Sequence, residues 1–143
     1  MTARVKGFLI WLALRTYAAL FCTCVRIELD GKLYMRRWFL RGRPSYEGET
    51  GPPGSYLQCI YRADADRRLH NHPWDSAHSR ILRGCYKEVS QFLDFPPVVA
   101  TYRAGDRNVL TEQVYHRITA VSRGGVWTWF TTSSKHGRGW GFR

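Results

Sequence analysis

The chain has 143 residues, which is enough for one domain with a hydrophobic core that needs no covalent cross-links. Apolar residues make up 44% and charged residues 23%, which excludes a disordered chain, and 15% aromatic residues favour a β-rich fold. The net charge of +11 suits nucleic acid, an acidic membrane, an anionic small ligand or simply a solvated basic surface. We do not expect nucleic-acid binding, because the basic residues are dispersed and no recognised nucleic-acid module is present.

The N-terminal segment, residues 1–24, is predicted to form an apolar helix. Its core, Gly7 to Val25, is long enough to cross a bilayer, but the central Arg15 would cost about 2.5–3.5 kcal/mol there. Three interpretations stay open: a helix packed on the domain, an interfacial or partner-binding helix, and a membrane anchor. The basic flank would suit an anionic membrane surface. We therefore expect a cytoplasmic protein, with peripheral contact at the inner membrane face as an alternative.

Residues 25–143 are predicted to form one β domain of many short strands. Turn signals such as Asp30-Gly31, Gly84 and Gly105-Asp106 separate them, and the Gly- and Pro-rich stretch Arg41 to Ser55 is a loop. This pattern is typical of a sandwich or barrel. The predicted strands are Val25–Leu29, Leu33–Leu40, Tyr56–Tyr61, Arg68–His72, Ser79–Leu82, Tyr86–Val89, Val98–Tyr102, Val114–Val121 and Val126–Thr131.

The cysteines do not form a recognisable metal or redox motif. Cys22 and Cys24 are separated by one residue rather than two, and Cys59 and Cys85 stand alone. Free buried thiols in a reducing compartment are the expected state.

Three histidines indicate a metal site. His70 and His72 are two residues apart in a predicted strand, so their side chains should share one face. A second strand that carries His116 would complete a face of three nitrogens, which is a common way to hold a divalent transition metal. Neither Asp75 nor His78 is expected to be a firm fourth ligand.

The spacing of these histidines resembles that of the cupin superfamily, small jelly-roll β-barrels with two motifs around one pocket. The first motif places His-x-His ahead of a glutamate and a turn glycine, and His70, His72 and Gly84 stand at matching positions. The second motif places a histidine eleven positions after a glycine, as Gly105 and His116 do. The resemblance implies an all-β, cupin-type jelly-roll barrel with a short N-terminal helix.

The departures from the cupin pattern narrow the resemblance. Ser76 or Ala77 stands where the family's glutamate ligand would fall, and Ala120 replaces the final asparagine of the second motif. A cupin without that glutamate is similar to the three-histidine subclass, of which thiol dioxygenases are an example. The resemblance implies a divalent metal, Fe(II) first, with Zn(II), Mn(II) or Ni(II) as alternatives. Several further stretches, among them Trp127 to Phe142, resemble small bacterial and phage cupins.

Tyr86 and Glu88 are the candidate catalytic residues. They share one face of a predicted strand just after the Gly84 turn. If that face points inward, Glu88 is a general base or a residue that orients a histidine, and Tyr86 is a hydrogen-bond donor. If it points outward, both are ordinary surface residues.

Two functions remain open at this level. The first is a metal-dependent, oxygenase-like cupin that acts on a small anionic substrate. The second is a non-catalytic cupin that binds a ligand, a nucleotide or a protein, and that is membrane-associated through its N-terminal helix. Exposed sheet edges also make a homodimer plausible.

Overall fold

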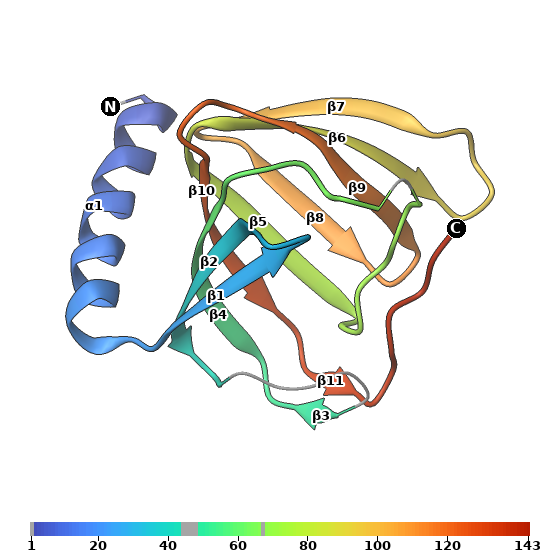
Figure 1. The fold of residues 1–143 in the computed structure, drawn as a ribbon, viewed down its shortest axis with the longest axis horizontal. Helices are drawn as coiled ribbons and strands as arrows, with labels where there is room; N and C mark the ends of the chain where they lie inside the picture. The colour runs from blue at the N-terminus through green and yellow to red at the C-terminus, as the bar shows by residue number, and fades with distance from the viewer. Residues whose placement is uncertain (1, 44–48, 67) are drawn as a thin grey trace.

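The computed structural model describes residues 2–43, 49–66 and 68–143. One helix, α1 (Ala3–Phe21), precedes a β domain, and Figure 1 shows the helix on the flank of this domain. The strands are β1 (Cys24–Leu29), β2 (Lys32–Arg41), β3 (Thr50–Gly51), β4 (Gly54–Ile60), β5 (Ser76–Arg83), β6 (Cys85–Phe92), β7 (Val98–Arg103), β8 (Arg107–Thr111), β9 (Val114–Val121), β10 (Val126–Thr132) and β11 (Lys135–His136).

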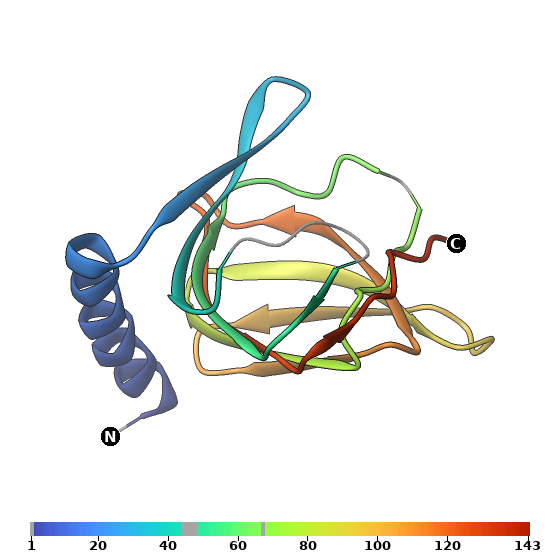
Figure 2. The same cartoon turned by 90° about the horizontal axis from the view of Figure 1, so that it is seen from below.

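Two antiparallel sheets make the barrel. The larger has the order β1-β2-β4-β10-β5-β8 and the smaller the order β7-β6-β9, while β3 and β11 form a short ribbon. Side chains from both sheets meet in one buried cluster, which includes Met35 of β2, Ile81 of β5, Tyr86 of β6 and Ile118 of β9. Figures 1 and 2 show the strands curving around this interior. The all-β fold with one N-terminal helix is therefore confirmed.

Local turn chemistry sets the first hairpin. Asp30 and Gly31 connect β1 to β2 with φ angles of 51° and 70°, and Leu29 pairs with Lys32. Two residues with positive φ make the turn whose twist matches a two-stranded hairpin, and Asp-Gly is a favoured sequence for it. The predicted loop from Arg41 to Ser55 is interrupted by β3 and the start of β4, and its residues 44–48 lie outside the described residues.

The predicted strand Arg68–His72 is wrong. In this segment only His70 makes β-bridges, one to His116 and one to Phe142. Alternation in sequence could not separate an isolated bridge from a strand, because the partners lie far along the chain. Conversely, β8 was not predicted, nor were the short strands β3 and β11.

Helix α1 packs against the outer face of the larger sheet. Thr2 caps its N-terminus by accepting a hydrogen bond from the Val5 N–H, and Gly7 and Ala18 are its buried residues. A Cβ atom on Gly7 would lie 3.3 Å from the Leu82 carbonyl oxygen, so a residue without a side chain lets the helix approach β5. The helix lies within the predicted helical segment of residues 1–24, and it begins and ends earlier than the apolar run Gly7 to Val25. Within the described residues, no helix is both long and apolar enough to cross a bilayer.

All four cysteines carry free thiols. Cys59 is fully buried, and burial raises its pKa to about 11, whereas Cys24 is exposed rather than buried. The division into a helix at residues 1–24 and a barrel domain from residue 25 stays a prediction.

Candidate metal centre

Three imidazoles converge between β9 and the segment that leads into β5. His70 and His72 come from that segment and His116 from β9, and their candidate ligand nitrogens all lie within 4.8 Å of one another. The Nε2 atoms of His72 and His116 are 2.8 Å apart. The His70 ring centroid lies 4.9 Å from that of His116 and 5.3 Å from that of His72. The structure thus brings together the histidines that the sequence pattern indicated, although not through a shared strand.

Backbone and amide hydrogen bonds fix the segment that carries His70 and His72. His70 and His116 exchange N–H···O bonds of 3.0 and 2.8 Å. Between the two histidines, the buried Asn71 side chain donates to the Glu112 carbonyl at 2.8 Å and accepts from the Gly141 N–H at 2.7 Å. Asn71 therefore takes the role that a continuous strand ladder would otherwise have.

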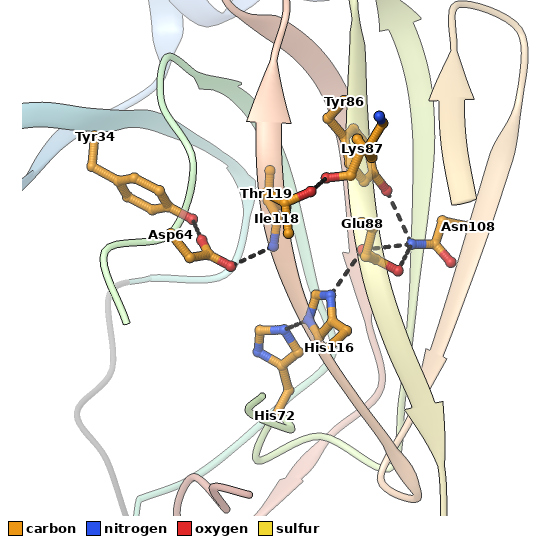
Figure 3. A network of polar contacts seen from close by, with 10 residues as sticks. All are labelled: Tyr34, Asp64, His72, Tyr86, Lys87, Glu88, Asn108, His116, Ile118 and Thr119. Atoms are coloured by element: carbon orange, nitrogen blue, oxygen red, sulfur yellow. Dashed lines mark hydrogen bonds and ion pairs between the residues drawn. The ribbon is translucent and has the colours of Figure 1, made fainter. Parts of the chain in front are cut away.

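A buried carboxylate orients His116, as Figure 3 shows. Glu88 is 1% exposed, and its Oε2 lies 2.8 Å from His116 Nδ1. The Asn108 amide donates to both Glu88 oxygens at 3.1 Å and to the Tyr86 hydroxyl oxygen at 3.0 Å. Tyr86 and Glu88 consequently face inward. An Nδ1–H held by Glu88 leaves the Nε2 lone pair of His116 for a metal.

Burial favours the neutral form of His70 and His72. Desolvation lowers the pKa of His72 well below its usual value, and His116, His70 and Arg37 lower it further. Burial, followed by the neighbouring His116, also lowers the pKa of His70. Neutral imidazoles are the form that binds metal. Burial and the Glu88 charge raise the pKa of Tyr86, so its hydroxyl stays protonated.

The donor set fits a transition-metal ion. Two nitrogens bound to one ion at about 2.1 Å and at right angles would be about 3.0 Å apart, close to the 2.8 Å between His72 and His116. Among the described residues, the Nδ1 of His72 is buried without a hydrogen-bond partner, so no such bond from that atom holds the ring away from an ion.

A cavity of about 60 Å³ adjoins His72 and His116 and is also lined by Tyr86 and Glu88. Arg37 of β2 lies between this cavity and an outer pocket of about 210 Å³. Its Nε donates to Gln58 Oε1 at 3.2 Å, and its guanidinium carbon is 5.1 Å from the Tyr56 ring centre. Among the described residues, Arg37 makes no ion pair with a carboxylate, and burial lowers its pKa.

Two tryptophans enclose His72. The Trp74 ring stacks on it with centroids 4.7 Å apart, and the Trp140 ring lies at 4.6 Å. The ring centroid of Trp140 also lies 5.4 Å from that of His70, so Trp140 is part of the candidate site. Trp127 and Trp129 are elsewhere: Trp127 packs beneath α1 and Trp129 donates to Ser55.

The other candidates lie outside the centre. Asp75 is exposed and pairs with His136 at 3.1 Å, and His78 is exposed on β5. Ala77 is buried in an apolar cluster with Leu110 and Phe130, so no carboxylate replaces the missing glutamate ligand at this position. The Glu88 carboxylate contacts the Nδ1 atom of His116, on the side of the ring away from the proposed ligand atom Nε2.

No family model and no curated protein sequence matches the chain. Solved structures match its fold. Streptomyces albus HEPD, with 2-hydroxyethylphosphonate and Fe(II) bound, superposes with a TM-score of 0.61 at 9% identity, over 81% of this chain and 25% of that one. Fe(II)-HppE with an alternative substrate superposes with a TM-score of 0.55 at 17% identity, over 79% of this chain and 56% of that one. KdgF from Halomonas sp. superposes with a TM-score of 0.53 at 11% identity, over 77% of this chain and 86% of that one.

These neighbours are cupin-fold proteins. The chain has the cupin fold. This chain spans about half the length of HppE and a quarter of HEPD. At such low identities the likeness establishes the fold and leaves the reaction to the site.

Sequence reasoning missed three residues of this cupin site. Asn108 lies on the unpredicted β8, where it shares the inward face with Leu110. Arg37 follows Arg36 in the sequence, and nothing local indicates which of the two faces the interior. Asp64 stands in no motif, yet its carboxylate accepts from the Ile118 N–H at 2.7 Å and from the Tyr34 hydroxyl.

Proposed function

We propose that this cupin is a metal-dependent, oxygenase-like enzyme that acts on a small anionic substrate. The observation that carries the proposal is a cluster of three imidazoles, two of which, His72 and His116, line the same cavity as the half-buried Arg37 guanidinium. His70, His72 and His116 would hold the metal. Fe(II) is the proposed ion, because the structural neighbours HppE and HEPD were solved with Fe(II). Bound there, it would supply redox chemistry with dioxygen and open positions for a substrate.

Arg37 is the proposed anchor for the substrate's anionic group. A half-buried guanidinium without a carboxylate partner among the described residues is costly to keep, and an anion that binds it would offset that cost. Its position between the two pockets would orient a substrate with the charged end at Arg37 and the other end toward His72. The small inner cavity supports a small substrate.

Glu88 and Tyr86 have different proposed roles. Glu88 holds the His116 ring, and both of its oxygens are engaged by Asn108 and His116, which favours orientation over proton abstraction. Tyr86 borders the cavity with a hydroxyl that stays protonated, which supports a role as a hydrogen-bond donor to substrate. The tryptophans around His72 exclude water from the same region.

Substrate binding tests the proposal directly. Protein reconstituted anaerobically with Fe(II) is titrated with small phosphonates and carboxylates by calorimetry, and oxygen uptake is then recorded. Arg37→Gln should weaken anion binding about tenfold or more with unchanged metal content, and Arg37→Lys should restore part of it. The matched control is Arg117→Gln, since Arg117 lies beside the inward His116 on β9 but alternates outward.

Two results would contradict the proposal. Equal anion affinity in the wild type and Arg37→Gln would remove Arg37 as the anchor. A metal-loaded protein that binds none of the anions and consumes no oxygen would instead favour a non-catalytic binding module.

A further inference from the structure

Helix α1 is apolar on two sides, and only one side is covered. Its inner side packs on the barrel through Gly7 and Ala18, and the Trp11 ring lies 5.8 Å from that of Trp127. The exposed large apolar side chains of this helix are Val5, Phe8, Leu9, Leu12, Tyr17, Leu20 and Phe21, with Leu20 at 69% and Phe21 at 72%. Figures 1 and 2 show that the helix stands beside the barrel with one side turned away from it. An uncovered apolar stripe of this kind is typical of a surface that contacts a partner or a membrane.

The charges around α1 have one sign. Between Thr2 and Ile27 the sequence has four basic residues and no acidic one. By helical periodicity, Arg4 and Arg15 border one side of the outer apolar stripe and Lys6 the other. The barrel adds Arg83, whose guanidinium lies 4.8 Å from the Trp11 ring centre.

A pocket at the end of the helix near Thr2 has one more cation and one acid in its lining. Arg103 and Asp106 line the pocket beside Thr2 and Arg4. The Asp106 carboxylate accepts a hydrogen bond from the Arg103 backbone N–H at 2.7 Å. The surface around α1 therefore remains strongly positive.

We propose that α1 docks this protein on an anionic lipid bilayer, lying in the plane of the interface. Leu9, Leu12 and Leu20 would enter the boundary of the acyl chains, while the bordering cations meet the lipid phosphates. The uncovered apolar stripe and the positive charges around it together favour an anionic bilayer over an uncharged one. The inference does not depend on the metal centre, because α1 lies on the outer face of the sheet.

Vesicle flotation of the full chain tests this surface. One vesicle population is pure phosphatidylcholine, and the other contains about 30% phosphatidylglycerol. The wild type should float with the anionic vesicles only, and raising the salt well above about 0.15 M should release it. Leu9→Gln combined with Leu12→Gln should reduce binding about tenfold or more. Arg4→Gln combined with Lys6→Gln should reduce it about fivefold per charge.

A matched variant controls for general stickiness. Val98 and Val99 on β7 are 61% and 62% exposed, so changing both to glutamine removes a comparable apolar area away from α1. That variant should float like the wild type. Because Leu9 and Leu12 are about half exposed and glutamine is a good helix former, circular dichroism should show an unchanged fold.

Three outcomes would overturn the proposal. The first is a wild type that does not float with anionic vesicles. The second is flotation that Leu9→Gln with Leu12→Gln leaves unchanged. The third is a lipid-free dimer that this double variant dissociates, since the stripe would then bind a second copy of the chain.

Discussion

At the scale of single residues, the decisive contact is the one between Glu88 and His116. A carboxylate that accepts the Nδ1–H of a ligating histidine fixes its tautomer and ring orientation and increases its basicity as a ligand. Here Asn108 in turn fixes the carboxylate, so the ring is set before any ion arrives. A pre-set ring lowers the entropy lost on metal binding.

Replacing Glu88 by glutamine tests this contact. The amide retains the shape but not the charge, so we expect metal affinity to fall about 10–100-fold. Competition with a chromophoric chelator measures that affinity. Glu28→Gln is the control, because Glu28 is exposed on β1 and, within the described part of the chain, forms an ion pair with Arg26 alone, at 3.4 Å. Equal affinities for the two variants would show that Glu88 does not support the ligand.

The residues of the site differ in how far the sequence could predict them. The histidines stand at a recognisable motif spacing, whereas the alternation around Glu88 left open whether its face points inward. Arg37 and Asn108 join them only because β2 and β8 are placed around the same cavity. Such long-range placement leaves no local signal in the sequence.

At the scale of elements, alternation and turn residues identified most of the strands. The error at Arg68–His72 has a physical cause. His70 pairs with His116 and Phe142, and Leu69 exchanges backbone hydrogen bonds with Arg143, so distant segments hold this piece of chain. The alternation of apolar and polar residues in a segment predicts which side chains are buried, but it does not predict which other segment pairs with it.

Gly84 offers a test of one turn. Its φ is +82°, and an added Cβ would lie 2.6 Å from the Gly125 carbonyl oxygen. We expect Gly84→Ala to lower the free energy of unfolding by about 2–4 kcal/mol, from backbone strain and crowding together. Gly31 also has a positive φ, +70°, but has open space around it.

Gly31→Ala therefore isolates the backbone contribution, which we expect to be about 1 kcal/mol. Urea denaturation of both variants gives the comparison. If the two variants lose the same stability, the crowding against Gly125 is not significant.

At the scale of the whole molecule, the fold separates two surfaces. His72 and His116 of the candidate metal centre line the cavity within the barrel together with Arg37, whereas α1 presents its uncovered stripe on the outside. In the proposed arrangement the barrel would be held at a membrane while its pocket remains a distinct site. A homodimer through an exposed sheet edge stays a prediction.

The three-histidine metal centre is the central claim, and metal stoichiometry tests it most directly. Untagged protein is reconstituted anaerobically with Fe(II), Mn(II), Zn(II) and Ni(II), and the bound metal is measured by elemental analysis. The wild type and His136→Ala should each retain about one equivalent, since His136 is exposed and pairs with Asp75. His72→Ala and His116→Ala should each lose most of it. Less than about a tenth of an equivalent in the wild type for every ion, or metal retained by His116→Ala but lost from His136→Ala, would contradict the account.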